Sequence, residues 1–228
     1  MQHKAQNDMQ DYFDEVIASY GQPAGEPLSP ATIDKLRGKV PNGLIRCWEK
    51  YGLGTVLDGF FQFVDPTRYS GVCEAVFDGD PELDPTRSHI IGLSAFGNLL
   101  IWNEKYHIIS IDLVNLKAFG SSLEKNEESN EKNLALIGGL SVVDRPSFDE
   151  RDSNGEGLFK PALQKLGRLK PNQIYGFVPM LALGGNRSID NLKIVSAPEH
   201  LLMLAQVGPV SLVDMSKPYG HKPRNIGG

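Results

Sequence analysis

The segment Pro41–Gly54, PNGLIRCWEKYGLG, carries the clearest fold signal in the chain. Pro41 suits the first turn of a helix, where no backbone N–H donor is needed, and Gly52 suits a left-handed cap at its end. Four apolar side chains recur between them at helical spacing on one face, namely Leu44, Ile45, Trp48 and Tyr51. The segment therefore predicts an amphipathic helix packed on a core. It indicates a structural element and not a catalytic one.

The elements around this helix predict the fold class. Amphipathic helices are expected over Met9–Tyr20, from Ser29 with Pro30, and from Asp65 with Pro66, and a strand is expected over Gly59–Val64. From Ser88 to Phe119 the apolar period becomes that of short strands separated by tight turns. The sequence therefore predicts an α+β protein, with N-terminal helices packed on an antiparallel β-meander and a smaller α+β C-terminal domain after it.

A polar stretch marks the expected domain boundary. Residues 121–133, SSLEKNEESNEKN, are mostly charged or polar, so we predict domains at 1–120 and 134–228 joined by a connector, although an exposed helix fits the same composition. In the second domain, Leu158–Leu169 predicts a helix, and residues 174–183 predict one or two strands, with another at 191–195. Ser196 and Glu199 predict a capping box before the last helix.

Composition excludes several classes of protein. The chain has 228 residues, of which 40% are hydrophobic, but no apolar run reaches the roughly 18 residues of a membrane span. The first residues lack the features of a secretory signal, so a cytoplasmic location is expected. The two cysteines form no CxxC motif and are expected to be core thiols.

Charge is distributed unevenly between the two halves. Residues 1–114 contain 16 Asp and Glu against 9 Lys and Arg, a net charge of −7, whereas residues 115–228 contain 12 against 14, a net charge of +2. The acidic half disfavours binding to nucleic acid and favours a basic protein partner. A merely solubilising surface is the alternative interpretation.

Catalytic and metal-binding motifs give mostly negative results. The five histidines show no HExxH pattern, and His107 and Asp112 are expected on opposite faces of one strand. The Gly184–Gly185 loop lacks the Lys of a phosphate-binding loop and fits a tight turn better. Two acidic stretches, residues 78–84 and 150–155, only partly match a calcium loop. We therefore predict no catalytic residue, no metal site and no cofactor.

Several segments together support a family resemblance. The segments YFDEVIASYGQP, PNGLIRCWEKYGLG and LSAFGNLLIWN resemble the GAD-like domain of bacterial immunity proteins. IYGFVPMLALGGNRSIDNLKIVSAPEHLLMLAQ is similar to the domain that accompanies it in Tdi-type immunity proteins of the type VI secretion system. The pairing in this order is more specific than either half, and it resembles in particular the Pseudomonas partner of a secreted DNase effector.

The resemblance implies a cytoplasmic antitoxin, without enzymatic activity, that binds a cognate nuclease toxin and blocks its active site or its access to DNA. The family motif assigns no inhibitory residue. The residues that match it are expected to define the scaffold, namely Trp48, Tyr51, Gly52, Trp102 and the Gly184–Gly185 turn.

Physical reasoning supplies the candidate contact residues. The first choice is an acidic cluster in a loop that prolines make rigid: Asp78, Asp80, Glu82 and Asp84. The second choice lies in the connector: Glu127, Glu128 and Glu131. Solvated charges without a partner are the plain alternative.

Two other functions stay open at this point, as do oligomeric state and stoichiometry. One is a non-enzymatic scaffold or regulatory module that binds a protein other than a toxin. The other is an enzyme whose site combines residues distant in sequence, such as His107 with the acidic cluster, and it requires a pocket with convergent titratable groups.

Overall fold

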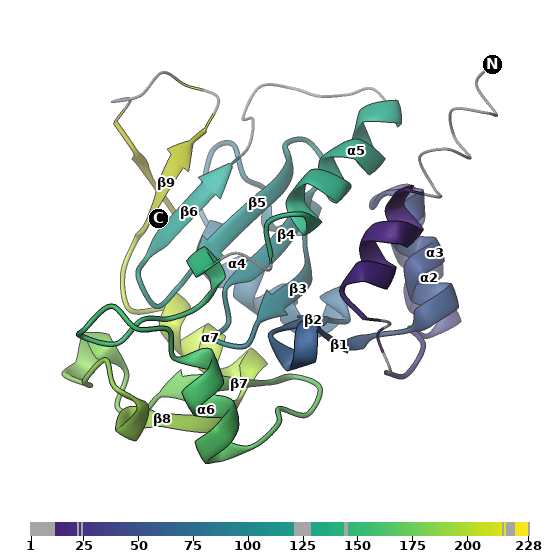
Figure 1. The fold of residues 1–228 in the computed structure, drawn as a ribbon. Helices are drawn as coiled ribbons and strands as arrows, with labels where there is room; N and C mark the ends of the chain where they lie inside the picture. Colours follow the sequence, from purple (N-terminus) through teal and green to yellow (C-terminus); the bar gives the residue numbers. More distant parts are fainter. Residues whose placement is uncertain are drawn as a thin grey trace.

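The computed structural model describes residues 12–21, 23, 25–120, 129–143, 146–215, 217 and 222–227 (Figure 1). A helix over residues 12–19 lies beside α2 (Pro30–Leu36) and α3 (Asn42–Tyr51) at one end of the molecule. The expected start of the first helix, before residue 12, lies outside the described residues. None of the described helices is long and apolar enough to cross a membrane.

Helix α3 confirms the prediction from the Trp-containing segment. Leu44 and Trp48 are fully buried in the core, and Pro41 immediately precedes the first helical residue. Gly52 caps the helix with φ 74°, and a Cβ atom there would lie 2.7 Å from the carbonyl oxygen of Gly25. Only glycine tolerates both the positive φ and this close approach of backbone.

One large sheet dominates the described structure. Its eight strands follow the order β1-β2-β3-β4-β5-β6-β9-β10, and every neighbouring pair is antiparallel except the parallel pair β6 and β9. The fold is therefore α+β with a mixed sheet, and the meander is confirmed. The strands are β1 (Gly54–Val56), β2 (Phe61–Phe63), β3 (Ser88–Ser94), β4 (Leu99–Asn103), β5 (His107–Asp112), β6 (Lys117–Gly120), β9 (Val210–Asp214) and β10 (Arg224–Ile226).

Strand β2 is shorter than the strand expected at residues 59–64. The 3₁₀ turn η1 (Leu57–Gly59) occupies the start of that stretch, and the pairing with β1 and β3 covers Phe61–Phe63. Asp58 adopts φ 57° inside the turn, which is a left-handed conformation. The chain therefore turns sharply between β1 and β2 instead of continuing as a strand.

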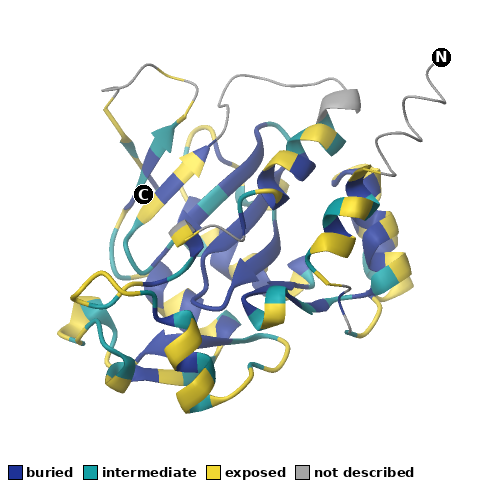
Figure 2. Cartoon of the chain, viewed as in Figure 1, coloured by how far each residue is buried: buried dark blue, intermediate teal, exposed yellow. Residues whose placement is uncertain are grey.

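Helices cover the two faces of the sheet separately. On one face, α5 (Ser129–Leu140) lies against β5, where Gly139 approaches Ile108 so closely that a Cβ atom would lie 2.8 Å from its side chain. On the other face, α4 (Ser70–Phe77) and α7 (Ala197–Ala205) pack on a second apolar cluster, which includes Ile109. Figure 2 shows the buried strands between these layers. Alternation along β5 therefore builds two cores from one strand.

The rest of the C-terminal half forms a small layer beside the main sheet. It contains η4 (Pro146–Phe148), α6 (Phe159–Leu166), the antiparallel pair β7 (Gln173–Phe177) and β8 (Leu192–Ser196), and the turns η5 (Leu181–Leu183) and η6 (Ile189–Asn191). Because Pro179 has no N–H to donate, the expected strand at 174–183 ends at Phe177. Gly184, with φ 85°, ends η5, as expected of a turn glycine.

The two halves of the chain share cores and a sheet. Strands β9 and β10 extend the sheet beyond β6, and Tyr175 and Phe177 join the same apolar cluster as Trp48. The polar stretch at 121–133 ends inside α5, which begins at Ser129, and residues 121–128 lie outside the described residues. The division into domains at 1–120 and 134–228 stays a prediction.

Candidate protein-binding site

The acidic loop, residues 78–84, connects α4 to the 3₁₀ turn η3 (Pro85–Arg87) ahead of β3. The side chain of Asp80 is only 1% exposed and forms an ion pair with Arg224 of β10, at 2.6 Å between Nη1 and Oδ2. Asp80 Oδ1 also accepts backbone N–H groups from Glu82 and Leu83. Asp80 therefore fixes the shape of the loop and joins it to the C-terminal edge of the sheet.

The electrostatics of Asp80 follow from these contacts. Burial by itself raises the pKa of this carboxyl group, but the hydrogen bonds from Arg224 and from the backbone outweigh it, so the pKa lies below its usual value. The pKa of Arg224 is raised, mainly because of its hydrogen bond to Asp80. Arg224 also contacts Glu82 at 2.8 Å, and the side chain of Glu82 stays half exposed at the surface.

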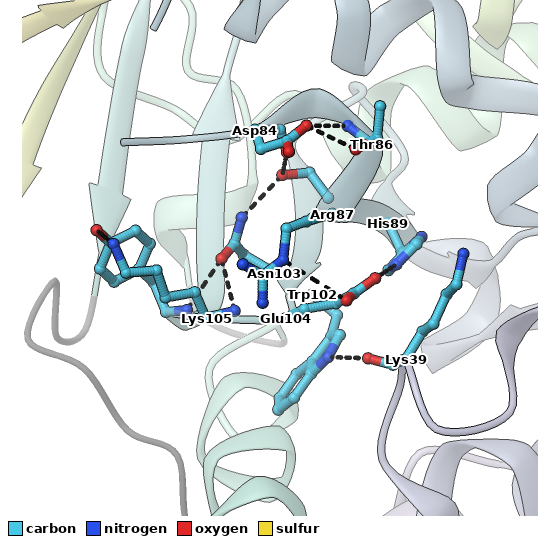
Figure 3. A network of polar contacts seen from close by, with 11 residues as sticks. Lys39, Asp84, Thr86, Arg87, His89, Trp102, Asn103, Glu104 and Lys105 are labelled. Carbon is cyan, nitrogen blue, oxygen red and sulfur yellow. Dashed lines mark hydrogen bonds and ion pairs between the residues drawn. The ribbon is translucent and has the colours of Figure 1, made fainter. Parts of the chain in front are cut away.

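Asp84 has a second structural role at the other end of the loop. Its Oδ1 accepts the backbone N–H and the hydroxyl group of Thr86, which caps η3 and lowers the pKa of Asp84. Its carbonyl oxygen accepts a hydrogen bond from Ser88, whose hydroxyl group in turn accepts one from Asn103 of β4 (Figure 3). The loop is therefore anchored to the meander as well as to β10.

The network in Figure 3 continues along the neighbouring strands β3 and β4. Glu104 contacts His89 at 2.9 Å and Arg87 at 3.7 Å, and its backbone N–H donates to the carbonyl group of Arg87. Trp102 donates its indole N–H to the carbonyl oxygen of Lys39, at 2.9 Å. The Trp102 contact joins the meander to the segment that follows α2, which agrees with a scaffold role for Trp102.

Asp78 differs from the other acids of the loop because it lines a groove. It follows the last residue of α4 and lines a groove of about 880 Å³. Glu74, one turn earlier in α4, lines the same groove, whose far wall comes from the end of α7 and from β9 and β10. The structure thus places one of the four predicted acids at a concave surface and uses Asp80 and Asp84 to hold the loop in place.

The second set of predicted contact acids falls at the start of α5 and before it in the sequence. Glu127 and Glu128 lie outside the described residues. The backbone of Glu131 lies in the first turns of α5, on the sheet face opposite α4. The choice of these three residues as contacts stays a prediction.

A buried polar cluster was missed by the sequence reasoning. Glu150 is 3% exposed, and it forms an ion pair with Arg187, which also donates to Asn115 at 2.6 Å. Burial, followed by the charge of Asp112, raises the pKa of Glu150 to about 7, against the lowering effect of Arg187. The only signal in the sequence was the partial calcium-loop pattern, but protein donors occupy the carboxylate of Glu150.

The remaining candidate catalytic and metal-binding residues make structural contacts. The His107 ring is 2% exposed and stacks on the Trp102 ring, with 4.8 Å between ring centroids. Asp152, which lies in the same partial calcium-loop pattern as Glu150, accepts the backbone N–H groups of Asn154 and Glu156. Among the described residues, no group of three or more His, Cys, Asp or Glu side chains is arranged to hold a metal ion.

Comparison with known proteins first gives the class of this fold. A family model described as "GAD-like domain" matches residues 11–115, which span the N-terminal helices, the acidic loop and most of the meander. A second model, described as "T6SS immunity protein Tdi1, C-terminal", matches residues 143–208, from the start of the small layer to the end of α7. No curated protein matches the chain.

A solved structure is similar to this protein along nearly the whole chain. The crystal structure of Atu4351 from Agrobacterium tumefaciens is similar with a TM-score of 0.89 and 30% sequence identity, over 95% of this chain and 98% of that chain. The chain belongs to the type VI secretion (T6SS) immunity proteins in which a GAD-like domain precedes a Tdi1 C-terminal domain. This confirms the resemblance drawn from the sequence.

Proposed function

We propose that this immunity protein acts in the cytoplasm, where it binds a cognate T6SS nuclease toxin and keeps the toxin from DNA. Membership of the family implies a protein toxin as partner and suggests a role without catalysis. The nuclease activity of that toxin, and the blocking of its active site or DNA groove, are the proposed steps.

The observation that supports this proposal is the charge of the GAD-like half. Residues 1–114 have a net charge of −7, and the acidic loop is held in a defined shape by Arg224. A nuclease needs a basic surface to bind phosphates. An acidic inhibitor therefore associates faster with the nuclease and competes with DNA for the same surface. An apolar centre must supply most of the lasting affinity.

Co-expression of this chain with the toxin encoded beside its gene tests the proposal. We expect a complex that survives size-exclusion chromatography and a toxin that cleaves plasmid DNA when free but not when bound. Without a complex, or with a toxin that attacks a substrate other than DNA, the proposal is wrong. A purified chain that itself turns over a substrate would favour the enzyme alternative.

A further inference from the structure

The groove beside Asp78 has the size and the walls of a binding site for a polypeptide segment. Its volume of about 880 Å³ lies at the upper end of the range for ligand pockets, so it admits several side chains. Small residues make up much of its wall and leave the backbone accessible: Gly71, Ala75, Gly79, Ala205, Gly208 and Gly227. Ile226 of β10 and the following Gly227 close one side.

The electrostatics of this groove favour a cation. Two helices end at it, because the C-cap residues Asp78 of α4 and Gln206 of α7 both line it. Helix C-termini carry a partial negative charge, which Lys or Arg in the last turn often offsets. Neither α4 nor α7 has a basic residue in its last turn. Both helices therefore end beside the same groove, and no basic residue in their last turns offsets the partial negative charge there.

Side-chain charges on the wall have the same sign. Glu74 and Asp78 are both exposed and line the groove, and none of the described lining residues is Lys or Arg. The nearby guanidinium group of Arg224 is already bound by Asp80 and Glu82. The wall therefore presents two carboxylates, and none of the described residues that line it supplies a cation.

We propose that this groove receives a segment of the toxin bearing Lys or Arg, whose cationic group binds between Glu74, Asp78 and the C-terminal ends of α4 and α7. The inference rests on the proposed function, because a surface that binds DNA phosphates is rich in such residues. It adds a defined binding position for the basic segment, here called the seat, between Glu74, Asp78 and the ends of α4 and α7. Charge steering alone requires only a net electrostatic field.

Filling the groove tests this seat directly. Gly71 lines the groove from α4, and a Cβ atom placed on it has no neighbour within 4 Å, so Gly71→Arg fits the helix and projects from the groove wall. We expect this variant to raise the dissociation constant for the catalytically inactive toxin about tenfold or more, mainly through faster dissociation.

Gly138→Arg is the matched control. Gly138 is also a helical glycine with no neighbour within 4 Å of its Cβ position, but it lies in α5 on the opposite face of the sheet. Both variants add one positive charge and replace a glycine inside a helix, so thermal melting is expected to show both proteins folded. We expect Gly138→Arg to change the dissociation constant less than about twofold.

A second pair of changes removes charge without filling the groove. Glu74→Gln with Asp78→Asn keeps the shape of the wall, and we expect the dissociation constant to rise about tenfold at low salt and less at high salt. If the wild-type chain binds the toxin and both groove variants bind equally well, the seat does not exist while the proposed function stands. A wild-type chain that fails to bind overturns both.

Equal loss of affinity in Gly71→Arg and Gly138→Arg would also overturn the seat, because the loss would then reflect added charge in general. So would a dimer of the free chain that Gly71→Arg dissociates, since the groove would then hold a second copy of this chain. Light scattering on the free wild-type protein and on both variants detects that dimer.

Discussion

Arg224 of β10 binds both carboxylate oxygens of Asp80, at 2.6 and 3.1 Å, across 144 positions of sequence. This contact ties the C-terminal edge strand of the sheet to the acidic loop of the GAD-like half. The side chain of Asp80 is nearly fully buried in this arrangement, whereas the side chain of Arg224 stays 34% exposed. The loop thus depends for its shape on a residue outside the domain to which it belongs by sequence.

Removing the partner of Asp80 is expected to destabilise the protein. Arg224→Gln leaves a buried carboxylate without its cation, and we expect a loss of about 1–2 kcal/mol in the free energy of unfolding, moderated by the exposure of Arg224. Urea unfolding measures the loss. The double variant with Asp80→Asn should recover part of it, and simple additivity of the two changes would contradict a direct coupling.

The same pair predicts a dependence of stability on pH. Because the folded-state pKa of Asp80 lies below the unfolded value, its contribution is present above the unfolded pKa of about 4 and is lost as the pH falls through the folded pKa. We expect the wild-type chain to lose more stability than Asp80→Asn between pH 5 and pH 3 (about two pH units). Urea unfolding at the two pH values measures both losses. An equal loss in the wild type and in Asp80→Asn would contradict this.

Glu150 predicts a pH dependence of the opposite sign. Its folded pKa of about 7 lies above the usual glutamate value of 4.5, so the folded protein binds the extra proton and loses stability as the pH rises between these values. We expect Glu150→Gln to abolish about 1–3 kcal/mol of that decline. The measurement compares urea midpoints at pH 5 and pH 8 for wild type and variant. An unchanged difference would show that Glu150 titrates normally.

Gly52 is expected to be intolerant of any side chain. Gly52→Ala combines a positive φ of 74° with a Cβ position 2.7 Å from the Gly25 oxygen, so we expect a loss of about 3 kcal/mol or more. Gly38→Ala is the control, because φ there is +79° but no atom lies within 4 Å. Its expected cost is only about 1 kcal/mol. Equal melting temperatures for the two variants would contradict the close approach.

Charge steering of the toxin is best tested at Asp78, since reversing all four loop acids would also break the contacts of Asp80 and Asp84. We expect Asp78→Lys to slow association with the toxin about threefold to tenfold and to reduce its salt dependence. Asp34→Lys is the control, because it makes the same change of charge at a side chain that is 76% exposed but lies in α2. Stopped-flow mixing measures both rates, and equal slowing would indicate a general field effect.

The parts of the fold with strong local signals could be predicted from the sequence. The α3 helix and the meander follow from apolar spacing and from glycine and proline at fixed positions, which act within a few residues. The strand ends at β2 and after Phe177 were predicted less well, because a left-handed turn and a proline interrupt patterns that hydrophobicity alone would continue.

The candidate site was predictable only as a set of charges. The sequence shows four alternating acids but not that Asp80 is buried by Arg224, that Asp84 caps η3, or that Asp78 alone of the four lines the groove. Each of these roles depends on backbone geometry or on a partner far along the chain. The buried contact between Glu150 and Arg187 was missed for the same reason.

The sequence by itself determined the scaffold, because Trp48, Gly52 and the alternating strands encode helix, cap and sheet through local sterics and burial. It also determined the family, through the order of its two sets of motifs. Only the tertiary structure decided which acids are structural and which face a groove. Pairing β9 with β6 and Arg224 with Asp80 joins segments far apart in sequence, and no local pattern specifies a contact of that kind.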